Sequence, residues 1–163
     1  MPIKLFDNQI NFQGGENLDE RVELINEYLV SVFNDILTIE ESELKKSSFN
    51  DLSIKEMHTI EAIGLYKKKT MSEVAKELSV TVGTLTVAVN HLVKKDYVER
   101  IRSEDDRRVV KLALTKKGKL VFRVHQAFHR KMVQEILKDM DNQQEDVLIT
   151  ALGKLHFFLQ EFK

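Results

Sequence analysis

The amino-acid sequence predicts a mainly α-helical fold with one small two-stranded β element. Apolar residues recur at steps of three and four along most of the chain, which is the spacing of one helix face. Between positions 97 and 115 the alternation changes to every second residue, which is typical of strands. The single proline is Pro2, so no proline interrupts a later helix.

The first elements are a tail and a long amphipathic helix. Residues 1–17 are polar and without a clear period, so we expect a weakly docked tail. Residues 18–45 carry one apolar stripe, with glutamates over much of the remaining surface. The stripe consists of Val22, Ile25, Leu29, Val32, Phe33, Ile36 and Ile39.

Three shorter helices follow, each with a capping signal at its start. Ser53 and Glu56 form one capping box and Thr70 and Glu73 another, and Thr81 can cap the third helix. Their predicted buried residues recur at helical spacing. These are Ile54, Met57, Ile60 and Leu65, then Val74, Ala75 and Leu78, then Leu85, Ala88, Val89 and Leu92.

A hairpin and two long helices complete the chain. Tyr97–Ser103 and Val109–Thr115 alternate apolar and charged residues on either side of a polar tip. Thr115 can cap a helix that continues to about Met140, and Asp141 begins the last helix.

This order of elements predicts a winged helix-turn-helix between long helices. We divide the chain into a tail (1–17), an N-terminal dimerisation helix (18–50), a DNA-binding unit (51–115) and C-terminal dimerisation helices (116–163). The apolar faces of the end helices are too wide to be buried in a small monomer, so we expect a homodimer.

Charge is distributed unevenly. The net charge is −1, but Lys67–Lys131 holds 17 Lys and Arg against 7 Asp and Glu, whereas the other residues hold 8 against 19. A basic segment favours phosphate contact through counterion release. The charge pattern predicts an anionic partner, and double-stranded DNA is the candidate that the helix order favours.

Composition excludes several classes of protein. The absence of cysteine excludes disulfides, thiolate zinc sites and cysteine nucleophiles. The sequence contains no run of 18 apolar residues that would predict a membrane span. The first residues lack the pattern of a secretory signal, so we expect a cytoplasmic protein. The sequence has no glycine-rich phosphate loop or nucleophile elbow, so we expect neither an enzyme nor a cofactor.

The third short helix has the residue types of a DNA-recognition helix. Threonine hydroxyls and amides at a helix start bind phosphate, and asparagine can pair with adenine. The predicted DNA-contacting residues are Thr81, Gly83, Thr84, Thr86, Val87, Asn90 and Lys94. An ordinary amphipathic helix with a polar outer face is the alternative.

The hairpin tip favours DNA binding over that alternative. Arg107 and Arg108 suit a wing, because arginine gains from the negative potential of a narrow minor groove. Asp106 could orient one guanidinium. A surface loop whose charges pair with one another remains the alternative for the tip alone.

Three segments resemble the MarR family of transcription regulators. They are Leu78–Val98 (LSVTVGTLTVAVNHLVKKDYV), Arg102–Arg108 (RSEDDRR) and Leu114–Gly118 (LTKKG). The resemblance covers about residues 20–162. It implies that Arg108 enters the minor groove, supported by Asp106. Many members carry basic residues where this chain has Val82 and Val87, which suggests a T-rich site contacted through apolar groups.

Within the family, the sequence is most similar to fatty-acid synthesis repressors of the FabT type. The similarity is carried by Ile25–Leu29, Asp51–Ile60, Val80–Thr84 and Ser103–Val110. It implies a repressor of fatty-acid biosynthesis genes that binds a palindromic operator as a homodimer, with acyl-acyl carrier protein as co-repressor. A regulator of another pathway that responds to a small molecule is the alternative.

An effector would act where the dimerisation helices meet the DNA-binding unit. The candidate effector residues are Met57, His58, His125, Phe128, His129 and Met132. His125 and His129 are four positions apart and, with a carboxylate, could bind a metal. Because this spacing is common by chance, we favour two partly exposed histidines without a metal. An acyl chain would need an apolar cavity near Met57, Phe128 and Met132, with His125 at its polar edge.

Arg108→Ala is expected to weaken operator binding strongly without unfolding the protein, because the side chain is predicted on an exposed loop. A gel-shift titration measures the affinity, and thermal unfolding of the variant is the control. Unchanged affinity would contradict the wing hypothesis.

Overall fold

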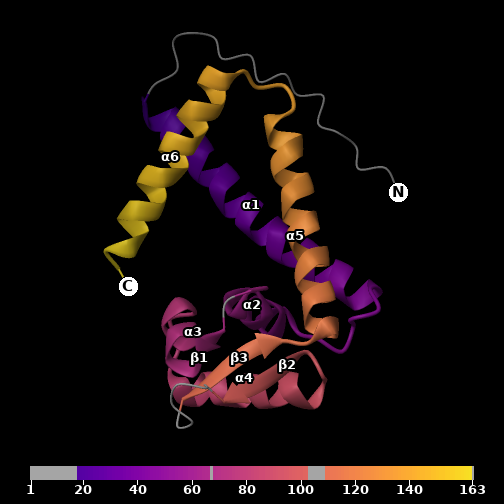
Figure 1. Ribbon diagram of the computed structural model, residues 1–163. Helices are drawn as coiled ribbons and strands as arrows, with labels where there is room; N and C mark the ends of the chain where they lie inside the picture. The colour runs from indigo at the N-terminus through magenta and orange to yellow at the C-terminus, as the bar shows by residue number, and fades with distance from the viewer. Residues whose placement is uncertain (1–17, 67, 103–108, 163) are drawn as a thin grey trace.

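A computed structural model describes residues 18–66, 68–102 and 109–162. Within these ranges the chain forms six helices and three strands, so the mainly helical class is confirmed (Figure 1). The elements are α1 (Leu18–Lys46), α2 (Ile54–Ile63), β1 (Lys69–Thr70), α3 (Met71–Glu77), α4 (Val82–Lys94), β2 (Val98–Arg102), β3 (Val110–Leu114), α5 (Lys116–Leu137) and α6 (Asn142–Gln160).

The elements form two parts. Helices α2, α3 and α4 pack with the small sheet into one compact unit, here called the winged unit (52–115), and α1, α5 and α6 form an open frame beside it (Figure 1). Helix α5 leads directly out of β3, and the C-terminal half of α1 crosses the lower part of α5. In the part of the chain that the structure describes, no helix is long and apolar enough to cross a membrane.

The predicted helix starts are confirmed. In each case a side-chain oxygen of the N-cap residue accepts a hydrogen bond from the backbone amide three positions later. The N-caps are Ser53, Thr70, Thr81, Thr115 and Asp141. Capping boxes are complete at Ser53 and Thr70, as predicted, and also at Asp141.

Two helix ends and the strand number differ from the prediction. Helix α2 ends at Ile63 rather than Leu65, because Gly64 has a φ of 77° and its amide bonds back to the carbonyl of Ile60. Helix α5 ends at Leu137, short of the expected Met140. The sheet has three antiparallel strands in the order β1-β3-β2, with Lys69 opposite Leu112, where the sequence predicted two strands.

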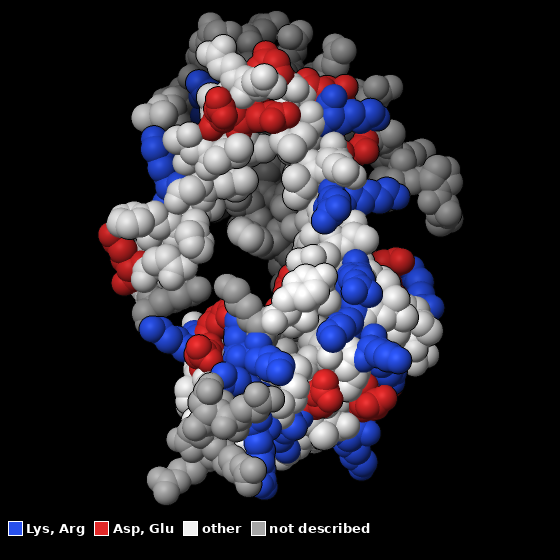
Figure 2. All heavy atoms as spheres, viewed as in Figure 1, with Lys and Arg blue, Asp and Glu red and all other residues white. Residues whose placement is uncertain are grey.

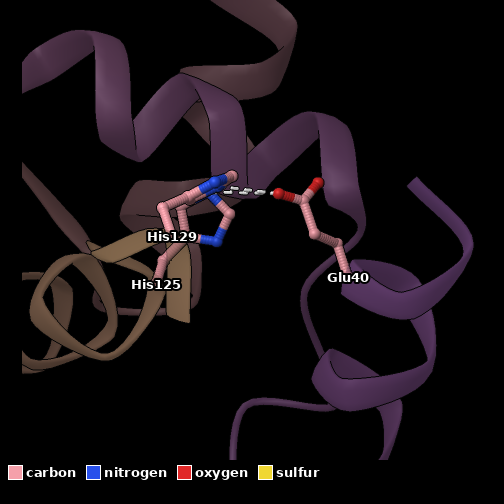
Figure 3. Close-up of side chains that lie close together, drawn as sticks. All are labelled: Glu40, His125 and His129. Carbon is pink, nitrogen blue, oxygen red and sulfur yellow. Dashed lines mark hydrogen bonds and ion pairs between the residues drawn. The ribbon is translucent and has the colours of Figure 1, made fainter. Parts of the chain in front are cut away.

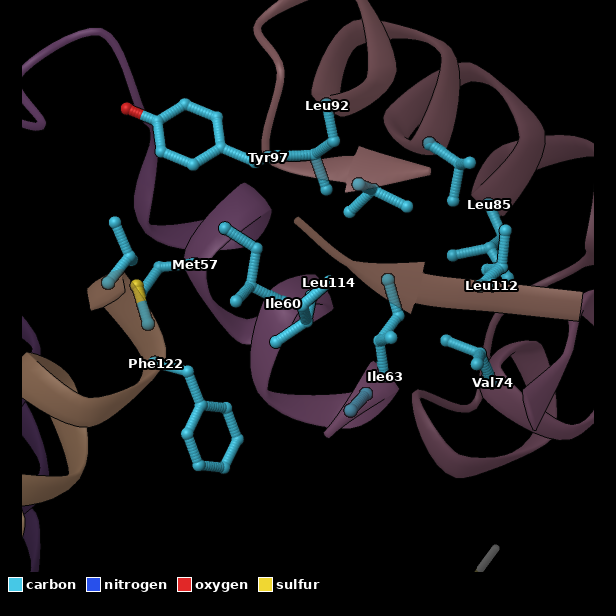
Figure 4. Close-up of a cluster of buried hydrophobic side chains, with 14 of the residues drawn as sticks. Met57, Ile60, Ile63, Val74, Leu85, Leu92, Tyr97, Leu112, Leu114 and Phe122 are labelled. Carbon is cyan, nitrogen blue, oxygen red and sulfur yellow. The ribbon is translucent and has the colours of Figure 1, made fainter. Parts of the chain in front are cut away.

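The hydrophobic core lies in the winged unit (Figure 4). Side chains from α2, α3, α4 and the sheet meet there, and Val121 and Phe122 join them from the first turns of α5. Tyr97 is fully buried and its hydroxyl donates to Asp51 Oδ1 at 2.6 Å. Burial, together with this hydrogen bond, raises the pKa of Tyr97 well above its ordinary value.

The start of α5 packs closely on the turn that precedes β2. The Thr115 amide donates to the carbonyl oxygen of Tyr97 at 3.1 Å. A Cβ atom on Gly118 would lie 2.1 Å from that oxygen and 3.3 Å from Leu114 Cβ. Only glycine therefore fits at position 118 without a shift of the backbone.

An ion pair joins the start of α2 to the end of α4. Lys95 Nζ lies 2.8 Å from both carboxylate oxygens of Glu56, whose carboxylate also accepts from the amide of Ser53 at 2.8 Å. Burial alone would raise the pKa of Glu56, but the hydrogen bonds from Lys95 and Ser53 hold it below its ordinary value. The pair fixes the C-terminal end of α4 against α2.

Gly118→Ala is expected to lower the free energy of unfolding by about 1–3 kcal/mol, the usual cost of overpacking, because the new methyl group meets a backbone carbonyl. Gly83→Ala is the matched control, since its Cβ would have no neighbour closer than 3.7 Å. Urea unfolding at one protein concentration measures both variants. Equal midpoints for the two would contradict the tight contact.

Candidate functional site

Helix α4 buries one face and presents the other to solvent. Leu85, Val89 and Leu92 are buried in the core, as predicted. Most of the predicted DNA-contacting residues are exposed, namely Thr81, Gly83, Thr84, Val87, Asn90 and Lys94. Thr86 is half-buried instead. Val87 is 57% exposed, so an apolar side chain stands in the middle of the outer face.

Hydroxyl groups at the start of α4 bond within the helix. Thr81 Oγ1 accepts from the amide of Thr84 at 3.1 Å and lies 2.9 Å from Thr84 Oγ1. The Thr86 hydroxyl donates to the carbonyl of Val82 at 2.7 Å. No acidic residue lies in the first turn, so the partial positive charge of the helix start is available to a phosphate.

Asn90 has a partner that the sequence did not reveal. Arg100 on β2 donates from Nη2 to Asn90 Oδ1 at 2.6 Å, and both side chains are exposed. Bidentate pairing with adenine needs both the oxygen and the amino group of an asparagine. Because an amide oxygen has two lone pairs, Asn90 Oδ1 can accept from adenine while it keeps its bond from Arg100, whose guanidinium adds a positive charge beside α4.

Basic side chains gather over the winged unit (Figure 2). Some of them are already paired within the chain: Lys69 Nζ lies 2.6 Å from Glu77 and also donates to the carbonyl of Ala62. Lys94 and Arg102 are exposed, as is Arg100, which bonds to Asn90. Asp106, Arg107 and Arg108 lie outside the described residues, although β2 and β3 pair from Val98–Leu114 to Arg102–Val110.

Comparison with known proteins establishes the family. A family model described as MarR family matches residues 50–109. The crystal structure of Streptococcus pneumoniae FabT in complex with DNA is 51% identical, covers 87% of this chain and 99% of that chain, and has a TM-score of 0.80. The chain belongs to the MarR family.

Other relatives agree with this placement. The uncharacterized HTH-type transcriptional regulator YpoP of Bacillus subtilis is 27% identical, over 79% of this chain and 84% of that protein. The HTH-type transcriptional regulator BilQ of Clostridium symbiosum is 28% identical, over 78% and 88%. This MarR-family chain is therefore a DNA-binding transcriptional regulator, and these relatives are regulators rather than enzymes.

The predicted effector residues lie where α1, α2 and α5 meet. A cavity of about 210 Å³ lies between these helices, and Met57, His125 and Phe128 line it. Met132 is half-buried but does not line the cavity. His58 and His129 line a second hollow on the other side of Glu40. The cavity is thus lined by part of the expected set.

The histidine pair differs from the expected arrangement. His125 is buried, at 9% exposure, where we expected partial exposure. Both rings face Glu40, a buried residue of α1. Glu61 on α2 lies 3.6 Å from His125, and this hydrogen-bonding partner lowers the pKa of the Glu61 carboxyl. Neither glutamate was identified from the sequence: Glu40 is one of six on α1, and Glu61 is one of two on α2.

Asn90→Ala is expected to relax sequence preference by about 1–3 kcal/mol at one base pair of each half-site, because a base-edge contact is lost. Fluorescence anisotropy against single-base operator variants measures this loss. Arg100→Ala is the comparison, since loss of its charge should weaken binding to all sequences alike. A uniform loss for Asn90→Ala would assign it to a phosphate contact instead.

Proposed function

We propose that the chain represses fatty-acid biosynthesis genes, binds a palindromic operator as a homodimer and uses an acylated acyl carrier protein as co-repressor. The observation that carries the proposal is the 51% identity to FabT over 87% of the chain. The identity extends far beyond the stretch that the family model matches, residues 50–109, and so includes the helices that would receive the effector.

Unburied apolar faces support the homodimer. Within the described part of the chain, α6 buries none of its residues. Its exposed apolar side chains are Val147, Ile149, Leu152, Phe157, Phe158 and Leu159. Helix α1 exposes a similar set, namely Val22, Ile25, Tyr28, Val32, Phe33 and Leu37. A two-fold partner would cover such faces and would place two recognition helices about one DNA turn apart.

The cavity between α1, α2 and α5 supports an apolar effector. Its apolar lining includes Leu44, Phe49, Ile54, Met57 and Phe128, and its polar edge is formed by Glu40, Glu43, Ser47 and His125. A volume of about 210 Å³ is below the roughly 300–1,000 Å³ of most ligand pockets. The end of an acyl chain would fit as it stands, and a longer stretch would require α1 and α5 to separate.

The same volume favours the second candidate function, a MarR-family regulator of another pathway that binds a small molecule. The DNA-binding mode is common to both candidates. Only the effector and the regulated genes differ between them.

Fluorescence anisotropy with a fatty-acid gene promoter fragment at fixed salt tests the proposal. A long-chain acyl-acyl carrier protein should tighten binding, and the unacylated carrier should not. Val124→Trp should remove this response and leave basal DNA binding intact, because Val124 lines the cavity. Val133→Trp is the matched control, being similarly exposed on α5 but absent from the lining. An acylated carrier without effect would remove the fatty-acid assignment.

A further inference from the structure

We propose that Glu40, His125 and His129 form a binding site for a divalent cation of the zinc class, completed by Glu61 and His58. The proposal goes beyond lipid-responsive repression, and it concerns side chains from three helices: Glu40 from α1, His58 and Glu61 from α2, and the other two histidines from α5.

Three donor atoms converge at this point (Figure 3). His129 Nε2 lies 2.8 Å and His125 Nε2 lies 3.8 Å from Glu40 Oε1, and the two nitrogens are 3.1 Å apart. Ligand atoms at the corners of a tetrahedron with bonds of about 2.0–2.1 Å are roughly 3.3 Å apart. The three atoms therefore already outline one face of a tetrahedral site.

Hydrogen bonds alone cannot give all three atoms, Glu40 Oε1, His125 Nε2 and His129 Nε2, a suitable partner within the cluster. A hydrogen on His129 Nε2 that points at Glu40 leaves this nitrogen without a lone pair for His125. A hydrogen donated from His125 to His129 leaves a lone pair of His129 facing the carboxylate. A cation between the three atoms would accept a lone pair from each of them.

Burial of Glu40 strengthens the case. The residue is 5% exposed, and a buried carboxylate is costly unless its charge is compensated. Its ion-pair partners are imidazoles: His125, His129 and His58, whose Nε2 lies 3.5 Å from the second carboxylate oxygen. Neutral imidazoles compensate none of that charge, whereas a divalent cation would compensate it fully.

Further ligands adjoin the first three. Glu61 Oε2 lies 3.6 Å from His125 Nε2, and the donor atoms of His58, Glu61 and His125 form a second group within 4.8 Å of one another. Two carboxylates balance a charge of +2. Imidazole donors suit zinc and neighbouring transition metals rather than magnesium or calcium, and a chain without cysteine lacks the thiolates that Cu(I) prefers.

The position of the cluster gives a cation access from the surface and links its binding to the position of α4. A hollow lined by Phe33, Ile36 and Leu37 reaches the cluster from one side. A bound cation would tie α1 and α5 to α2, which packs against recognition helix α4. Binding of the cation would therefore change the position of α1 and α5 relative to the winged unit, and with it the affinity of the protein for DNA.

Isothermal titration of the metal-stripped full-length protein with Zn²⁺ tests the site, and Co²⁺ absorption reports its geometry. We expect one cation for each chain. Glu40→Gln and His129→Ala should each weaken Zn²⁺ binding at least tenfold, because loss of a ligand costs more than loss of a second-shell group. His156→Ala is the matched control, since it removes an exposed histidine of α6 outside the cluster.

Urea unfolding of the metal-free variants shows whether weaker Zn²⁺ binding comes from the lost ligand or from an unfolded protein. If His129→Ala does not fold, Glu40→Gln still tests the site, because glutamine keeps the shape of the glutamate side chain. The absence of stoichiometric binding, or wild-type affinity in folded Glu40→Gln, would overturn the proposal. Because the titration contains neither DNA nor acyl carrier, its result is independent of the fatty-acid assignment. Anisotropy with Zn²⁺ and with chelator then measures the effect on DNA affinity.

Discussion

The winged unit depends on the close contact between the carbonyl of Tyr97 and the start of α5. After α4 the chain turns through Asp96, whose φ is 62°, and Tyr97 then enters the core. Its carbonyl accepts from Thr115, and the same oxygen leaves no room for a Cβ at Gly118. One peptide group therefore fixes the end of α4, the start of β2 and the direction of α5. Because α5 carries exposed apolar side chains as well as His125 and His129, its direction relates these features to α4.

Local signals explain what the sequence predicted well. A capping box requires only two residues three positions apart, so Ser53 and Thr70 mark helix starts whatever packs around them. The outer face of α4 follows from its helical period in the same way. Strand β1 has two residues, too few to show alternation, and it exists only because Lys69 and Thr70 lie against β3. The earlier end of α2 depends on Gly64 taking a positive φ, a freedom that the sequence allows but does not require.

Tertiary packing explains what the sequence could not show at the sites. Glu41 pairs with Lys45 one turn away on the surface, whereas Glu40, its neighbour, is buried against histidines from two other helices. Helical spacing places Glu40 on the apolar stripe, seven positions after Phe33 and four after Ile36, but only the crossing of α1 with α5 shows which side chains it meets there. Arg100 and Asn90 are likewise joined only when β2 folds back along α4. The helical period predicted that His125 and His129 share a face, but it did not predict that Glu40 and Glu61 contact them.

The cavity and the histidine–glutamate cluster share side chains, since Glu40 and His125 belong to both. A ligand in the cavity that displaces either side chain changes the affinity of the cluster for a cation, and linkage requires the reverse effect to be equal in free energy. Both regions include residues of α2, whose first turn is held to the end of α4 by Glu56 and Lys95. A shift of α2 would therefore be transmitted to α4 through the ion pair of Glu56 with Lys95 as well as through the core. Either proposed signal, an apolar effector in the cavity or a cation in the cluster, would therefore reach α4 through the same contacts of α2.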